Sequence, residues 1–142
     1  FETMPQIKKW LEEGKVVILD RYVSSNQIHQ GGKIRDKKAR QEFLEWLGEM
    51  EYEKLGITKP DMVLYLDMPA DISKTLIEER VGTKDLADDN WNYLENSKEA
   101  GEYMLSFDDS WVRVNCAPDG TLLFRQEIHE LIWTAIKDNL SI

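Results

Sequence analysis

Apolar residues in this chain alternate between short continuous runs and longer stretches with helical spacing. The short runs predict buried β-strands over residues 16–20, 62–66 and 111–115. Helical spacing predicts helices around and between these strands, over residues 1–13, 24–30, 36–55, 70–80, 92–105 and 124–138. Because strands alternate with helices, the pattern predicts an α/β fold with a parallel, doubly wound sheet.

The number of predicted strands is small for such a sheet, and the chain opens on Phe1 inside a helical pattern. We therefore expect a domain that is incomplete at its N-terminus, with further strands before residue 1. No internal repeat, low-complexity tract or linker divides the sequence. Residues 1–142 are expected to form one partial domain.

Charge and composition exclude several classes of function. The net charge of −9 weighs against a broad nucleic-acid-binding surface, because such a surface needs a positive face. A small phosphorylated ligand needs only a few nearby cationic side chains, so its binding is compatible with this negative charge. Cys116 is the single cysteine, so no internal disulfide forms. A single cysteine suits a reducing compartment, so we expect a cytoplasmic protein. No apolar run approaches the ~20 residues of a membrane helix, so we expect no membrane partner.

The charged pair Asp20–Arg21 directly follows the first predicted strand. Ligands of open parallel sheets bind at the carboxyl ends of the strands, and charges are costly in a plain core. Arg21 offers a planar fork of donors suited to a phosphate, and Asp20 offers an acceptor for a metal-bound water or a hydroxyl. The alternative is a structural ion pair at a strand end.

Several segments, in this order, resemble the thymidylate (dTMP) kinase family. Residues 19–22 (LDRY) with Ser25 and Asn26 resemble its DRY-type signature, and the glycines at 31 and 32 follow as in that family. Residues 57–67 (ITKPDMVLYLD) resemble the entry to its next strand. Glu79–Arg80 resembles the start of its lid, which we expect at roughly 80–90, and residues 114–118 resemble its last strand and adenine loop.

The resemblance implies a nucleoside-monophosphate kinase of the P-loop type, typically homodimeric, that transfers a phosphoryl group from ATP to dTMP with Mg²⁺. The family's GxxxxGK(S/T) motif does not occur in these 142 residues. By the family's layout it is expected upstream of Phe1, and the chain by itself is expected to be inactive. Alternatives are a related deoxynucleoside or nucleoside-monophosphate kinase and a non-catalytic nucleotide-binding relative.

The resemblance also implies roles for individual residues. Arg21 would hold the acceptor phosphate, and Asp20 would bind Mg²⁺ through water. The lid would contribute Lys84 and Arg80, and Arg80 is expected to be catalytic together with Asp20 and Arg21. The rest of the substrate pocket is expected to consist of Ser25, Asn26, His29 and Gln30. The adenine loop is expected to consist of Cys116, Ala117 and Pro118.

Some positions keep a second interpretation. Asn26 is alternatively a helix cap. His29 stands where the family prefers Tyr or Phe near the sugar, which leaves the preference for deoxyribose open. One apolar helical face is either a dimer surface or core, and it consists of Phe43, Trp46, Leu47 and Met50.

Overall fold

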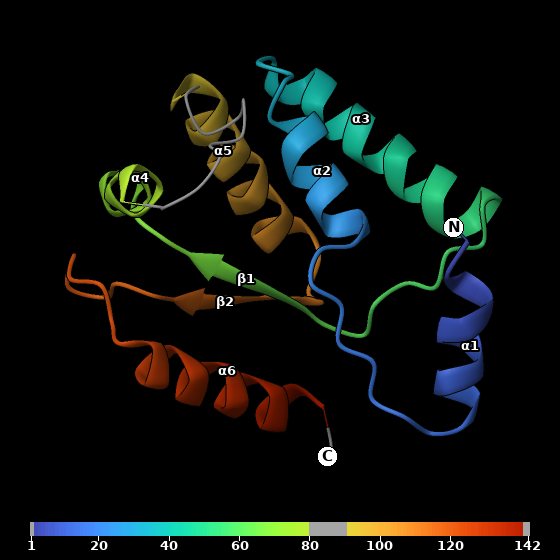
Figure 1. The fold of residues 1–142 in the computed structure, drawn as a ribbon. Helices are drawn as coiled ribbons and strands as arrows, with labels where there is room; N and C mark the ends of the chain where they lie inside the picture. The colour runs from blue at the N-terminus through green and yellow to red at the C-terminus, as the bar shows by residue number, and fades with distance from the viewer. Residues whose placement is uncertain (1, 80–90, 141–142) are drawn as a thin grey trace.

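The computed structural model describes residues 2–79 and 91–140 of the chain (Figure 1). Arg80, Lys84 and the expected lid at 80–90 lie outside these ranges. The elements, in chain order, are α1 (Met4–Glu12), α2 (Val23–Gly31), α3 (Lys37–Gly48), a π-helical segment η1 (Glu49–Lys54), β1 (Val63–Asp67), α4 (Ala70–Glu78), α5 (Trp91–Phe107), β2 (Trp111–Asn115) and α6 (Arg125–Asn139).

The sheet of the described ranges consists of β1 and β2, which pair in parallel. The register runs from Val63 opposite Trp111 to Asp67 opposite Asn115. Helix α6 lies on one side of these strands, and α2, α3 and α5 lie on the other (Figure 1). The parallel α/β architecture is therefore confirmed for these two strands.

The larger apolar core joins α3, α5 and β2. Its buried centre is Leu44, Met104 and Trp111, and the ring of Tyr65 packs against it. Gly101 permits this contact, because a Cβ at that position would lie 2.7 Å from two ring carbons of Tyr65. The absence of a side chain thus sets how closely α5 approaches β1.

A smaller core joins α1 to the start of α2. Met4, Ile7, Val23 and Ile57 are buried there, and Val17 packs against them. This cluster anchors α1 and the chain that leads into α2.

The predicted strand at 16–20 is wrong for this structure. The segment has no regular secondary structure, and Val16, Ile18 and Leu19 are exposed, Ile18 to 82%. A strand needs a partner for its backbone groups, and in the described ranges β1 and β2 pair only with each other. Only Val17 reaches the small core, so the apolar run lies mostly at the surface.

The helix predicted at 36–55 divides into α3 and η1. Asp36 caps its start, since its Oδ1 accepts a hydrogen bond from the backbone N–H of Ala39 at 2.8 Å. The chain leaves η1 through Gly56, whose φ of 63° suits glycine. In η1 the backbone hydrogen bonds join residues five apart instead of four, and the apolar pattern of the sequence did not predict this change.

Candidate functional site

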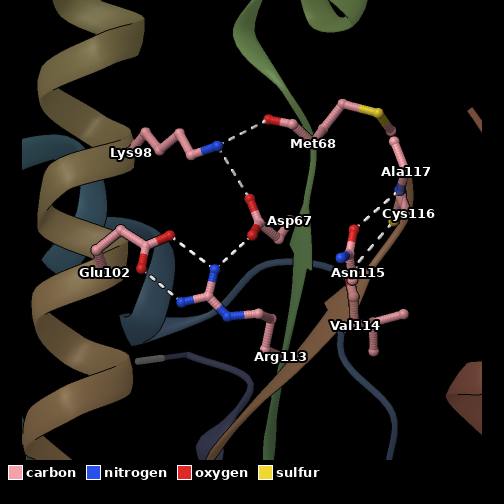
Figure 2. A network of polar contacts seen from close by, with 9 residues as sticks. All are labelled: Asp67, Met68, Lys98, Glu102, Arg113, Val114, Asn115, Cys116 and Ala117. Atoms are coloured by element: carbon pink, nitrogen blue, oxygen red, sulfur yellow. Dashed lines mark hydrogen bonds and ion pairs between the residues drawn. The ribbon is translucent and has the colours of Figure 1, made fainter. Parts of the chain in front are cut away.

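The carboxyl end of β1 carries a network of charged side chains (Figure 2). Arg113 of β2 donates to Asp67 Oδ2 and, at 2.8 Å, to Glu102 Oε1 of α5. Lys98 of α5 approaches Asp67 Oδ1 at 3.1 Å and the carbonyl oxygen of Met68 at 3.4 Å. One carboxylate therefore joins both strands to α5.

Electrostatics keeps this network charged. Burial opposes ionisation of Asp67, whose side chain is only 14% exposed, but hydrogen bonds from Arg113 and Lys98 lower its pKa below the ordinary value. The hydrogen bond to Glu102 raises the pKa of Arg113. Asp67 is thus held in its ionised form by its two basic neighbours.

A closed turn follows β2 and contains the predicted adenine loop. Asn115 Oδ1 accepts from the N–H of Ala117 at 3.0 Å, and the Cys116 carbonyl accepts from the N–H of Leu123 at 2.9 Å. Cys116 and Ala117 are buried and Pro118 is exposed. A ligand at this turn would therefore meet Pro118 and the backbone rather than the thiol.

Asp20 and Arg21 lie together in the turn that leads into α2, and both are exposed. Arg21 has a φ of 68°, in the left-handed region that non-glycine residues seldom adopt. The next residue, Tyr22, is anchored by a hydrogen bond from its hydroxyl to the Thr58 carbonyl at 2.9 Å. Strained backbone of this kind is frequent at functional sites.

Helix α2 carries the four expected pocket residues. Asn26 Nδ2 donates to Glu51 Oε1 at 3.2 Å, and Gln30 Oε1 accepts from Lys33 Nζ at 2.8 Å. Ser25 and Asn26 are half-buried and Gln30 is exposed. Tyr22 holds the N-cap position, so the alternative interpretation of Asn26 as the cap of this helix is wrong.

His29 stacks on Tyr93 of α5, with ring centroids 5.7 Å apart and an angle of 13° between the planes. Burial, Arg21 and Lys33 all lower the pKa of His29, so its imidazole is neutral at pH 7. Its Nδ1 is buried and has no hydrogen-bond partner in the described ranges. The lowered pKa of His29 indicates that the positive charges of Arg21 and Lys33 act on its ring.

Two cavities flank α5. One, of about 190 Å³, lies between α2, β1, α4 and α5, and it is mainly apolar with Ser97 and Lys98 at its wall. The other, of about 450 Å³, is polar and is lined by Arg35, Arg40, Asn92, Glu95, Asn96 and Glu99. Within the second, Arg40 Nη1 pairs with Glu99 at 3.1 Å.

The sequence interpretation missed the network of Asp67, Lys98, Glu102 and Arg113. Two signals were present: Asp67 follows a buried strand just as Asp20 follows an apolar run, and Arg113 stands between Val112 and Val114 of a strand. Pairing across elements 46 residues apart has no local sequence signal.

Comparison with known proteins identifies the family. The family model described as thymidylate kinase matches residues 2–132. The chain belongs to the thymidylate kinase family. The resemblance based on the DRY segment and the strand entry at 57–67 is thereby confirmed at the level of the family.

Individual thymidylate kinases match shorter segments. The chain is 34% identical over 58 residues to the thymidylate kinase of Mycobacterium tuberculosis strain H37Rv, covering 41% of this chain and 27% of that protein. It is 35% identical over 73 residues to the thymidylate kinase of Leuconostoc mesenteroides, covering 51% of this chain and 32% of that protein. The matched segments thus span about a third or less of these relatives.

Two further observations concern metals and membranes. In residues 2–79 and 91–140, no three His, Cys, Asp or Glu side chains converge to hold a metal ion. Among the helices of the same ranges, none is both long enough and apolar enough to span a membrane.

Proposed function

We propose that this chain forms the dTMP-binding part of a thymidylate kinase, which transfers a phosphoryl group from ATP to dTMP and yields dTDP. The family match over residues 2–132 carries this proposal. The 142 residues contain no GxxxxGK(S/T) sequence, so binding of dTMP is the part of this function that these residues can be tested for.

Arg21 is the proposed ligand of the dTMP phosphate. Arg21 is exposed and therefore accessible to a nucleotide. Its backbone, with a positive φ, lies directly before the start of α2. Two parallel N–H donors match a phosphate in geometry and charge. Lys33, which interacts with the same His29 as Arg21, adds a second positive charge on this side of α2.

The proposed nucleoside contacts lie along α2. Asn26 and Gln30 carry amides able to read a pyrimidine edge, and Ser25 adds a hydroxyl. The neutral ring of His29, stacked on Tyr93, forms an aromatic wall beside them. The unpartnered Nδ1 of His29 gives this wall a polar atom that a Phe would lack.

The proposed contacts with ATP and Mg²⁺ are supported only by membership of the thymidylate kinase family. Mg²⁺, when bound, neutralises charge on the transferring phosphates. Asp20 is the proposed acceptor for a water of that ion, since the described residues offer it no cluster of protein ligands. Arg80 and Lys84 are proposed to contact ATP, and residues 116–118 its adenine. A homodimer in the cytoplasm completes the proposal.

Calorimetric titration of the 142-residue chain with dTMP tests the proposal. We expect saturable binding that Arg21→Met weakens by about tenfold or more, the usual effect of losing a charge-assisted hydrogen bond. Arg125→Met, on distant α6, is the matched control and should bind as the unmodified chain does. Absence of saturable binding, or equal affinity for thymidine, would contradict the proposal.

A second series separates dTMP from other acceptors. His29 in place of a larger ring motivates the related nucleoside and nucleoside-monophosphate kinases as alternatives. Titration with dUMP, CMP and thymidine compares them directly. Tighter binding of CMP or thymidine than of dTMP would favour those alternatives.

A further inference from the structure

Glu51 is a half-buried carboxylate that contacts the first turns of α2. Its Oε1 accepts a hydrogen bond from Asn26 Nδ2 at 3.2 Å, although the two residues are 25 positions apart in the sequence. Burial and, in addition, the charge of Glu51 raise the pKa of Tyr22, which stands at the N-cap of the same helix. Two observations therefore place the carboxylate of Glu51 beside the start of α2.

The backbone of Glu51 is held in place by the small core. Glu51 belongs to the π-helical segment η1, and its carbonyl oxygen accepts a hydrogen bond from the N–H of Ile57 at 3.0 Å. Ile57 is only 9% exposed and packs with Met4, Ile7 and Val23. Short π-helical turns are frequent at functional sites. The carboxylate of Glu51 therefore extends from a backbone that the core fixes.

This contact determines which end of the Asn26 amide remains for a ligand. An amide has a donor end and an acceptor end, whereas a carboxylate only accepts. Asn26 must therefore turn Nδ2 toward Glu51, and Oδ1 is left on the other side. Within residues 2–79 and 91–140, Oδ1 of Asn26 accepts no hydrogen bond from another residue. Asn26 thus presents an acceptor.

The second amide on this face of α2 is turned the opposite way. Asn26 and Gln30 are four residues apart and so lie on one face of the helix. Lys33 Nζ donates to Gln30 Oε1 at 2.8 Å, and an ammonium only donates, so Nε2 of Gln30 is the end left for a ligand. The two amides thus offer one acceptor and one donor. Thymine carries a matching pair on one edge, the N3–H donor beside the O4 acceptor.

We propose that Glu51 is a positioning residue, which fixes the orientation of the Asn26 amide and so favours thymine over cytosine. The N3 of thymine carries a hydrogen and donates to Oδ1, whereas the N3 of cytosine is an acceptor. An amide that turns freely meets either base, and a carboxylate partner removes that freedom. This inference rests on the proposed binding of dTMP along α2 and adds the residue that selects the base.

The test is calorimetric titration of the chain and of Glu51→Gln with dTMP and with dCMP. Glutamine has the same shape as glutamate but also donates, so Asn26 can turn over while the contact with residue 51 persists. We expect the ratio of the dCMP to the dTMP dissociation constant to fall by about three- to tenfold, the effect of one hydrogen bond. A purely structural role of Glu51 would weaken both nucleotides alike and leave this ratio unchanged.

Glu49→Gln is the matched control, because it makes the same change of charge in the same segment η1. Glu49 is exposed and pairs with Lys54 at 3.5 Å, so the ratio should stay as in the unmodified chain. Asn26→Ala provides a second control. In that background Glu51→Gln should no longer change the ratio, because the carboxylate has no amide left to orient.

NMR of the nucleotide-free chain tests the contact itself through the side-chain N–H signals of Asn26. These signals should shift in Glu51→Gln and stay in place in Glu49→Gln. Signals that do not respond to Glu51→Gln, or a ratio that it leaves unchanged while dTMP still binds, would overturn this inference alone. Absence of dTMP binding by the unmodified chain would contradict the proposed function and this inference with it.

Discussion

Arg113 shows how one side chain connects several elements. It lies in β2 and donates to Asp67 of β1 and to Glu102 of α5 (Figure 2). Asp67 in turn contacts Lys98 of α5. Each contact is a modest charged hydrogen bond, but together they fix α5 over the carboxyl end of the sheet.

Replacing Arg113 with Met should therefore destabilise the fold. The change leaves Glu102 and the poorly exposed Asp67 without their shared donor. Since the side chains of Arg113 and Glu102 are 39% and 41% exposed, we expect a loss of about 1–2 kcal/mol in the free energy of unfolding. Urea denaturation of the variant and of the unmodified chain measures this difference in the free energy of unfolding.

The matched control is Lys38→Met, which breaks a largely exposed pair with Glu42. Its effect should stay below about 0.5 kcal/mol. Equal effects of the two substitutions would show that the Arg113 network contributes no more than a surface ion pair.

At the scale of elements, close approach between α5 and β1 depends on Gly101. Glycine normally weakens a helix, and alanine there would raise its intrinsic propensity. The space is taken by Tyr65, whose ring lies 2.7 Å from the position of an added Cβ. Packing therefore outweighs propensity at this position.

Gly101→Ala should destabilise the protein by about 1–3 kcal/mol, because an overpacked interface must shift. Gly48→Ala at the end of α3 is the control, since no atom lies within 4 Å of its Cβ position. That change should stabilise by about 0.5–1 kcal/mol. Thermal unfolding of both variants measures the difference, and two stabilising changes would refute the close contact.

Periodicity predicted elements well where one face of the element is buried. The strand at 111–115 is confirmed with its predicted bounds, and the strand predicted at 62–66 is displaced by one residue to Val63–Asp67. The helix predicted at 92–105 is confirmed within α5. The strand predicted at 16–20 is wrong, because an apolar run signals burial and does not specify a partner for its backbone.

At the scale of the whole molecule, acidic residues control stability at low pH. Hydrogen bonds from basic and hydroxyl partners outweigh burial and lower the pKa of both Asp67 and Asp108. A lowered pKa in the folded state means that the unfolded chain takes up protons first as the pH falls. The stabilisation is therefore complete above the unfolded pKa of about 3.9 and is lost as the pH falls through the folded values.

The double variant Asp67→Asn, Asp108→Asn should accordingly be less stable than the unmodified chain at pH 7. The difference should narrow as the pH falls from about 5 to about 2, because the native carboxylates then become neutral as well. Urea midpoints at several pH values measure this, with exposed Asp138→Asn as control. A difference that stays constant with pH would contradict the assignment.

The sequence by itself determined the family, the parallel α/β character and the position of most helices, because local periodicity and contiguous motifs carry those signals. It placed Asp20 and Arg21 at the carboxyl end of a buried strand, whereas in the structure both are exposed in the segment that leads into α2. Only the tertiary structure decided the exposure of the 16–19 segment, the stacking of His29 on Tyr93 and the network around Asp67. Those features depend on contacts between residues far apart along the chain, and no local pattern records which distant residue becomes a neighbour.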